Sequence, residues 1–449
     1  MIHIFRFLVI IILMITAKMA GQEVYTLDEC VTYALKHNLQ MRDYDLNALS
    51  GRESYRQSIR DLLPSLIGSS NYVINFGRST DPFTNDVVTT DFFSNRYTLE
   101  TSVDLYRGFQ KQNTIRATKL LYKATQEEAL QQRYLLAFRV MQAFYDIKFF
   151  KGLVAISKEQ VAVSQANYDL VVKQIELGMK AGADLYEAES LLLSDKLNLT
   201  QSENRLVSAK LQLIQEMNLE GANDIEIRPN LEFESALYDE SLVQSDSIYG
   251  RAKEFLPLLK AQELRVKAAK KQLAAERGAL FPSLSLFAGT ATGYFETTRD
   301  SLANTIPFRD QFRDNTSQFV GFSLNVPISN IWAARGRIKQ QKIERLRAEN
   351  NMEIQHQVVF ETIRQLVQEY RSLEIQREQS SQKVKAQELA FTIAQKRYEK
   401  GLINALELFT AKNLFASAQN ENLQVSLRSE INRSTLNFYK GLPVFNICQ

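Results

Sequence analysis

The sequence contains few of the residues on which most catalytic and metal sites depend. Its 449 residues include three histidines and two cysteines. His3 lies in an N-terminal apolar region, and neither His37 nor His356 has a partner at metal-ligand spacing. There is no glycine-rich phosphate loop, nucleophile elbow or Cys-x-x-Cys pair. We therefore expect no enzymatic activity, no cofactor and no metal site.

An excess of charge is also missing. Lys and Arg number 54 and Asp and Glu number 51, which gives a formal net charge of +3, and the two signs are interspersed. This balance argues against a nucleic-acid partner. The two cysteines, Cys30 and Cys448, either form a disulfide between the two ends of an exported chain or remain separate thiols.

Long hydrophobic runs are absent except at the N-terminus. Residues 7–15 are apolar, follow His3 and Arg6, and precede small and polar residues. This pattern predicts a secretory signal peptide over residues 1–21, with an uncleaved anchor as the alternative. No later segment approaches the ~20 apolar residues of a membrane-spanning helix.

Glycine and proline are nearly absent from two long stretches in which apolar residues recur every seven positions. A strict seven-residue period predicts helices that supercoil against neighbours. The first stripe comprises Val140, Ile147, Val154, Val161, Tyr168 and Ile175. The second, 223 positions later and interrupted only by Arg377, comprises Ile363, Tyr370, Val384, Phe391 and Tyr398.

The two stripes belong to a duplication. Gly401 stands in the second copy where Gly178 stands in the first, and Glu407 stands for Asp184. We predict two structural repeats, each with a helix, a β-hairpin and a long helical hairpin. The predicted segments are a first repeat over 22–222 with hairpins 66–106 and 107–221, a linker over 223–239, and a second repeat over 240–442 with hairpins 283–328 and 333–440.

Each β-hairpin is predicted from residues that alternate between apolar and polar. In the first, Tyr97, Leu99, Thr101, Val103 and Leu105 interleave with charged or polar residues. The polar stretches 77–94 and 296–315 are predicted to be loops. The strands are either a soluble hairpin with one wet face or transmembrane strands with lipid on the apolar side and water on the other.

Four amphipathic strands are too few for a barrel, because about eight are needed even for a filled interior. The strands therefore form either a soluble sheet or one part of a barrel shared among several chains. In lipid every strand edge must be paired, so the membrane interpretation requires an oligomer.

From Tyr25 to Pro443 the chain resembles the TolC-like outer-membrane efflux protein family, also called outer membrane factors. The resemblance rests on three motifs that occur in the same order as in the family. They are Leu27-Asp-Glu…Ala34-Leu-Lys-His-Asn38, the Pro-Ser-Leu entries to both strand pairs at 64–66 and 282–284, and the two tips Glu176-Leu-Gly-Met…Asp184-Leu and Tyr398-Glu-Lys-Gly-Leu…Glu407-Leu.

The resemblance implies a mainly α-helical fold with a transmembrane β part. In a homotrimer, four strands per chain would contribute to one shared β-barrel in the outer membrane, and the helical hairpins would form a periplasmic α-barrel tunnel. It also implies that the hairpin tips contact a periplasmic membrane-fusion adaptor, which links the channel to an inner-membrane pump of the RND or ABC type. The tip residues concerned are Gly178, Met179, Asp184, Gly401, Leu402 and Glu407.

Family members carry acidic residues that constrict the tunnel at the second tip. Glu407 occupies the first such position here, and Thr410 occupies the second, so a double acidic ring is not expected. The alternative role for Glu407 is an ordinary carboxylate in the first turn of a helix, where the helix dipole favours it. Trp332, after the fourth strand, is either an interfacial aromatic residue in contact with outer-membrane lipid or a packed core residue.

We therefore predict a passive outer-membrane channel, the exit duct of a tripartite efflux or type I secretion system that carries small molecules or proteins. The competing hypothesis is a soluble periplasmic coiled-coil adaptor or scaffold. An adaptor should contain a glycine-rich, β-rich lipoyl-like domain within its hairpin, and the sequence shows none.

Overall fold

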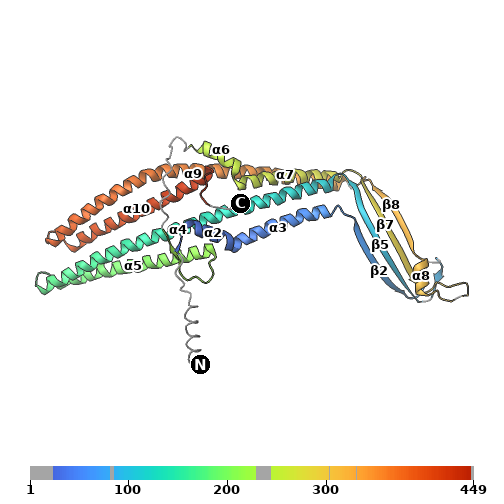
Figure 1. Cartoon of the computed structure of the whole chain (residues 1–449), viewed down its shortest axis with the longest axis horizontal. Coiled ribbons are helices and arrows are strands. Elements are labelled where there is room, and N and C mark those ends of the chain that lie inside the picture. The colour runs from blue at the N-terminus through green and yellow to red at the C-terminus, as the bar shows by residue number, and fades with distance from the viewer. Residues whose placement is uncertain are drawn as a thin grey trace, which may run out of the picture. The chain divides into compact units, whose positions relative to one another are not determined.

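The structure, a computed structural model, describes residues 24–80, 85–89, 91–228, 244–302, 304–329 and 331–445 (Figure 1). The expected signal peptide, Cys448 and most of the expected linker lie outside these residues. The chain divides into two compact units. Unit 1 comprises Met1–Asp45, Glu128–Pro257 and His356–Gln449, and unit 2 comprises Leu46–Glu127 and Leu258–Gln355.

Unit 1 is built mainly from two long helical hairpins. The first joins α4 (Gln110–Glu176) to α5 (Gly182–Met217), and the second joins α9 (Ile331–Glu399) to α10 (Ala405–Tyr439). The first residues of α4 and of α9 belong to unit 2. Unit 1 also holds α2 (Leu27–His37), the start of α3 (Leu39–Arg60) and α6 (Ser245–Phe255).

Both seven-residue stripes face the interior of unit 1. Val140, Ile147 and Val154 are buried, and the remaining members of the first stripe are half-buried. Ile363, Phe391 and Tyr398 of the second stripe are buried too, while the exceptional Arg377 is exposed. The period therefore marks the packed side of each helix, as expected for supercoiled helices.

A capping box starts α2. The Thr26 Oγ1 accepts from the backbone N–H of Glu29, and the Glu29 Oε2 accepts from the N–H of Thr26 at 2.7 Å. Just before it, β1 (Val24–Tyr25) pairs in parallel with β6 (Glu226–Ile227), which lies in the described part of the expected linker. This pairing ties the start of the described chain to the segment that follows α5.

Cys30 lies in the core of unit 1, among Val31, Val140 and Phe144. Its thiol is free and fully buried, and burial raises its pKa to about 12. A thiol in this state supplies almost no thiolate at neutral pH, and the thiolate is the nucleophile.

In a Cys448→Ser variant, Cys30 should therefore not react with Ellman's reagent at pH 8 while the protein is folded. It should react fully in guanidinium chloride. Rapid modification of the folded variant would show that the core around Cys30 opens readily.

Unit 2 contains a four-stranded antiparallel sheet in the order β2-β5-β7-β8. The strands are β2 (Ser65–Asn75), β5 (Phe92–Arg107), β7 (Ser283–Phe295) and β8 (Ser317–Asn325). The register sets Leu99 beside Gly68 and Thr290, and it sets Leu286 beside Val103 and Phe322. Apolar side chains of successive strands therefore share one face of the sheet, and the polar series Arg96, Thr98, Glu100, Ser102 and Asp104 lies on the other.

Each strand continues from or into a helix of unit 2. The end of α3 precedes β2, α4 follows β5, α7 (Pro257–Gly278) precedes β7, and α9 follows β8. Contacts join these helices side by side: Ser58 to Thr118 at 2.9 Å between α3 and α4, and Lys270 to Glu349 at 3.5 Å between α7 and α9. Between α4 and α7 the backbones meet at Gly108 (φ +56°), where a Cβ would lie 2.2 Å from the Gly278 oxygen.

The helix that precedes β7 is broken near Pro257, because α6 ends at Phe255 and Pro257 opens α7. The two predicted loops are wrong in part. The first contains a small ribbon of β3 (Ser79–Thr80) and β4 (Val87–Val88), and β5 begins within it at Phe92. The second contains α8 (Phe308–Asp314), which is too short to show a helical period in the sequence.

Tertiary contacts hold α8 in place. The buried Gln311 side chain donates to the Phe295 carbonyl and accepts from the Phe295 N–H, both at 3.0 Å.

Within the described residues, none of the helices combines the length and the apolar character required to traverse a bilayer.

Candidate functional site

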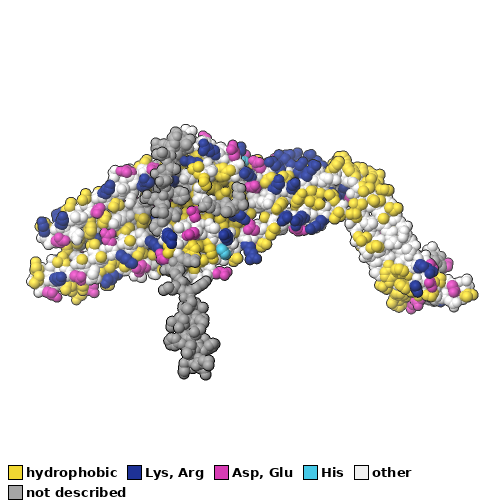
Figure 2. Space-filling view, viewed as in Figure 1, with side chains coloured by type: hydrophobic (Ala, Val, Ile, Leu, Met, Phe, Trp, Pro, Cys, Tyr) yellow, Lys and Arg dark blue, Asp and Glu magenta, His cyan; other side chains and the backbone are white. Residues whose placement is uncertain are grey.

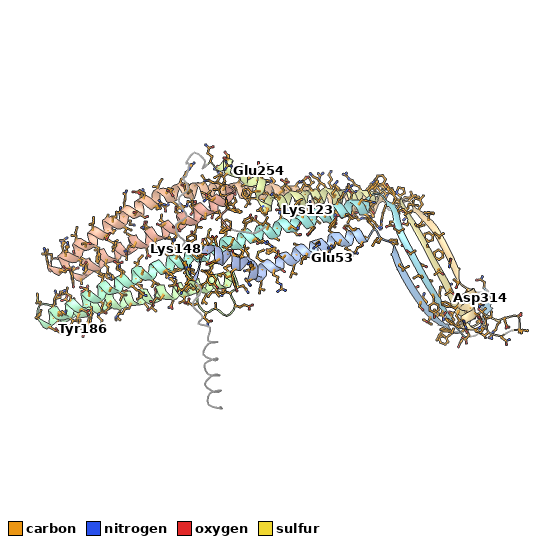
Figure 3. The ribbon with its side chains drawn as sticks, viewed as in Figure 1. Glu53, Lys123, Lys148, Tyr186, Glu254 and Asp314 are labelled. Carbon is orange, nitrogen blue, oxygen red and sulfur yellow. The ribbon has the colours of Figure 1, made fainter. Side chains whose placement is uncertain are left out.

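The tip of the first hairpin is a short turn between α4 and α5. Gly178 has φ +72°, a conformation that glycine adopts without strain, and its N–H bonds to the Ile175 carbonyl at 2.8 Å. Asp184, the third residue of α5, accepts from the N–H of the N-cap residue Ala181 at 3.2 Å and so caps the start of the helix from inside its first turn. Around this turn large apolar side chains are exposed, namely Leu177, Met179 and Tyr186, the last labelled in Figure 3.

The tip of the second hairpin repeats this geometry with different side chains. Gly401 has φ +67° and bonds to the Tyr398 carbonyl at 2.9 Å. Asn404, rather than an acidic residue, caps α10, because its side-chain oxygen accepts from the Glu407 N–H at 2.8 Å. Leu402 and Leu406 are exposed.

Glu407 and Thr410 lie one turn apart at the start of α10, and both are exposed. The Thr410 hydroxyl donates to the Leu406 carbonyl at 2.8 Å. Asn404 satisfies the Glu407 backbone, and no described Lys or Arg forms an ion pair with the Glu407 carboxylate. This carboxylate is therefore free to act outside its own chain, whereas Asp184 in the first tip is used as a cap.

If Glu407 lines a narrow entrance, Glu407→Ala should raise single-channel conductance in planar bilayers, because the shorter side chain widens the entrance. It should also weaken block by multivalent cations, because a negative charge is lost. Glu187→Ala is a matched control, since Glu187 is an exposed carboxylate in the first turns of α5. Equal conductance of wild type and Glu407→Ala would dismiss the gate role.

The two hairpins touch near their tips. The Lys180 ammonium, next to the first tip, donates to the Tyr398 hydroxyl at 3.1 Å and lies 4.9 Å from the centre of its ring. Beneath this contact is an apolar cluster in which Phe391 stacks on Phe415 at 5.9 Å. Val163 and Leu170 of α4 pack against this cluster. The two helical hairpins are therefore in contact with each other immediately behind both tips.

Further from the tips, a buried ion pair joins α5 to α10. The Lys412 ammonium pairs with Asp195 and donates to the Ser164 hydroxyl of α4 at 2.7 Å, and that hydroxyl donates to Asp195. Lys412 is only 2% exposed. Burial lowers the pKa of the Lys412 ammonium, and the carboxylate of Asp195 opposes this effect.

The sequence predictions missed this triad, although it leaves a trace in the sequence. Asp195 continues a series of buried positions on α5 that includes Ala188, Leu192 and Ser202, and Lys412 lies between buried Leu408 and Phe415. A charged residue at a core position of a supercoiled helix predicts a buried polar contact. Its partner cannot be predicted, because the two residues are 217 positions apart.

Lys412→Met should cost roughly 3–5 kcal/mol of unfolding free energy, because it leaves Asp195 buried without a counter-charge. The double variant Lys412→Met/Asp195→Leu should recover most of this loss, since replacing a whole buried pair with apolar side chains is often neutral. Denaturant titrations in detergent measure both. A double variant no more stable than Lys412→Met would contradict this account.

Trp332 lies in the first turn of α9 and is 76% exposed, so the packed-core alternative is wrong for the isolated chain. The Arg335 guanidinium lies 5.2 Å from the centre of its ring. The arrangement leaves the indole available to a surface outside the chain.

The sequence of this chain is similar to those of known proteins. A family model described as "Outer membrane efflux protein" matches residues 31–218 and 248–442. The cation efflux system protein CusC of Escherichia coli (strain K12) is 23% identical over 399 residues, which cover 87% of this chain and 80% of that protein. The antibiotic efflux pump outer membrane protein ArpC of Pseudomonas putida is 22% identical over 421 residues, 93% of this chain and 82% of that protein.

Solved structures agree on the fold. A crystal structure of CusC matches with a TM-score of 0.79 at 19% identity and covers 94% of this chain and 93% of that chain. The CmeC outer membrane channel of Campylobacter jejuni also matches with a TM-score of 0.79, at 15% identity, over 92% of this chain and 85% of that chain.

Proposed function

Because this chain belongs to the outer membrane efflux protein family, we propose that three copies of it form one passive channel through the outer membrane. Family membership excludes the competing hypothesis of a soluble periplasmic adaptor. The observation that carries the trimer is the sheet of unit 2. Within the described residues its outer strands, β2 and β8, each pair on one side only.

Open edges of this kind are costly in a membrane. Each unpaired N–H or C=O in hydrocarbon costs several kcal/mol, on the order of a lost hydrogen bond or more. The side chains of β8 suit apolar surroundings, because Val320, Phe322 and Leu324 are 74%, 69% and 67% exposed on one face. Pairing β8 of one chain with β2 of the next satisfies these edges and closes the sheet.

Three copies supply enough strands. A filled barrel needs about eight strands and a wider one encloses water. Three sheets of the kind seen here exceed that number, and their polar faces would line the lumen. The helical hairpins would likewise form sections of a tunnel wall, with the seven-residue stripes as the packed seams between helices.

The exposed tips are the proposed contact with a periplasmic membrane-fusion adaptor. Leu177, Met179 and Tyr186 in one tip, and Leu402 and Leu406 in the other, present apolar side chains around the two glycine turns. Exposed apolar groups of this density are typical of protein-binding surfaces. Asp184 and the glycines Gly178 and Gly401 shape these tips, and Glu407 is proposed as the charge that narrows the entrance, with Thr410 one turn further along α10.

An inner-membrane pump, of the RND or ABC type, would supply the energy, and the channel itself would be passive. The relatives carry names that refer to cations and to antibiotics. No group of three or more His, Cys, Asp or Glu side chains in the described part of the chain is arranged to hold a metal ion. We therefore assign the choice of cargo to the pump and not to the duct.

The proposal predicts a heat-modifiable trimer in the outer-membrane fraction. Purified protein should run as one trimeric species in mild detergent and shift to the monomer position only after boiling in SDS. A monomer in mild detergent, or protein recovered in the soluble periplasmic fraction, would refute the shared channel.

A further inference from the structure

The helices of unit 2 carry far more positive charge than the chain as a whole. Within α7 there are six Lys and Arg against two Glu. Residues 331–347 of α9 contain six against one Glu, and residues 110–127 of α4 contain four against one Glu. Figure 2 shows these side chains as a dark blue cluster over α7 and the start of α9, next to the strands.

Most of these charges lie on one face of the helices. Residues that are three, four or seven positions apart lie on the same side of a helix. Nine such residues lie within eleven positions of the strand-side end of their helix, and we call them the basic belt. They are Arg116 and Lys119 in α4, Lys267, Lys270, Lys271 and Arg277 in α7, and Arg335, Lys339 and Lys342 in α9.

Eight of the nine are exposed, and Lys271 is half-buried. Carboxylates neutralise little of this charge. Lys267 pairs with Glu263 and Lys270 with Glu349, and no ion pair to any described residue is formed by the other seven. The basic belt is therefore available to an anionic partner from outside the chain.

The opposite face of the same helices is different in character. It holds a cavity of about 270 Å³ lined by Asp61, Lys111, Thr114 and Glu276, among others. Thr114 and Arg116 are two residues apart on α4, so their side chains project to opposite sides of the helix. The cavity and the basic belt lie on opposite faces.

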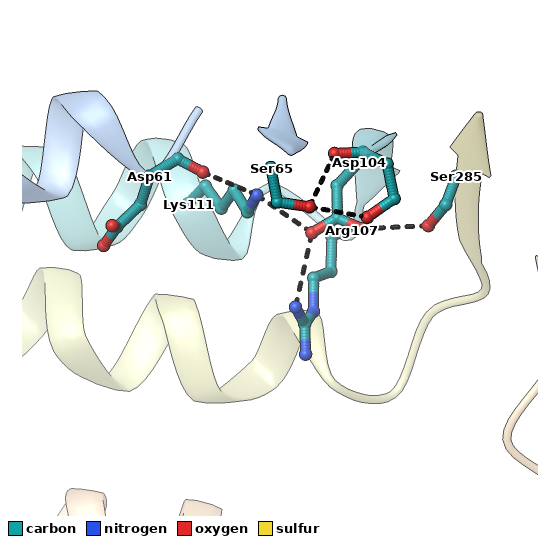
Figure 4. A network of polar contacts seen from close by, with 7 residues as sticks. Asp61, Ser65, Asp104, Arg107, Lys111 and Ser285 are labelled. Atoms are coloured by element: carbon teal, nitrogen blue, oxygen red, sulfur yellow. Dashed lines mark hydrogen bonds and ion pairs between the residues drawn. The ribbon is translucent and has the colours of Figure 1, made fainter. Parts of the chain in front are cut away.

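A polar network connects the cavity face to the polar face of the sheet (Figure 4). The Lys111 ammonium lies 2.9 Å from Asp104 and donates to the Asp61 carbonyl at 2.7 Å. The Ser285 hydroxyl donates to the other Asp104 oxygen at 2.9 Å. Asp104 ends the polar series of β5, so the basic belt must lie on the same side as the apolar series, which includes Val103 and Phe322.

Aromatic side chains lie between the apolar strands and the belt. Tyr106 contacts Phe109 edge-to-face at 5.5 Å, and Phe109 is exposed at the start of α4. Trp332 occupies the corresponding place at the start of α9, against Arg335. Moving away from the strands, the surface passes from apolar to aromatic to cationic, which is the order found across a membrane interface.

We infer that the basic belt binds the phosphate headgroups of anionic phospholipids in the periplasmic leaflet of the outer membrane, an inference that rests on the proposed membrane position of the sheet. The belt spans roughly 17 Å along the helices at 1.5 Å per residue. The belt residues nearest the strands reach the phosphate headgroups directly, helped by their long aliphatic side chains. The belt residues further from the strands attract the headgroups electrostatically, because they lie within about two Debye lengths of ~8 Å. Continuity with the apolar face favours lipid over an anionic cell-wall polymer.

The test compares wild type with a belt variant, Arg277→Gln/Arg335→Gln/Lys339→Gln/Lys342→Gln. The control variant, Lys196→Gln/Arg205→Gln/Lys385→Gln/Lys396→Gln, removes the same charge from exposed positions of unit 1. Each trimer is extracted from vesicles of phosphatidylethanolamine and phosphatidylglycerol, and the retained lipids are quantified. Wild type and control should enrich phosphatidylglycerol several-fold over the vesicle composition, whereas the belt variant should lose this enrichment.

A second measurement separates failure of this inference from failure of the membrane placement. Trp332 is the only tryptophan, so brominated phospholipids should quench the emission of reconstituted wild type. Quenching without phosphatidylglycerol enrichment would overturn the belt inference alone. Absence of quenching would overturn both. If belt substitutions reduce binding to purified peptidoglycan but leave the lipid preference unchanged, the occupant is the cell wall and the inference is wrong.

Discussion

The need to pair every backbone hydrogen-bonding group of the sheet governs this protein. The described sheet satisfies its interior through three antiparallel pairings, but β2 and β8 each leave one edge without a partner. In water such edges are a risk of aggregation, and in lipid they are not tolerated. In a membrane, a chain with a sheet of this kind is therefore stable only as part of a closed assembly.

The same constraint explains how the helices of unit 2 are arranged. Every strand of the four-stranded sheet is preceded or followed by a helix, so the order of the sheet imposes the order α3, α4, α7 and α9 on the helices beside it. The two faces of the sheet continue as two faces of the helices, joined by Asp104 and Lys111 on the polar side. The apolar side carries the basic belt. The net charge of the chain is small, so positive charge is concentrated there only because the helices separate the belt from the opposite face.

Unit 1 depends on a different balance. Its stripes bury apolar side chains along α4 and α9, yet the interior also contains the ion pair of Lys412 with Asp195. A buried pair adds little net stability but strongly penalises arrangements in which one partner is left alone. We therefore expect the triad with Ser164 to favour one alignment of α4, α5 and α10. The tips lie beyond this point, and the two copies differ there, with Asp184 used as a cap in one and Glu407 left free in the other.

The sequence alone was enough to predict the repeated hairpins and the strand pairs, because the packing of supercoiled helices and amphipathic strands appears in the sequence as periods of seven and two. The family was predicted from the resemblance of the opening, strand-entry and tip motifs. Tertiary structure decided the rest. The helix α8, the partner of Lys412 and the exposure of Trp332 depend on residues far away in the chain. The basic belt is scattered over three helices, and only the fold brings its charges to one face, since sequence spacing orders residues around one helix and not between helices.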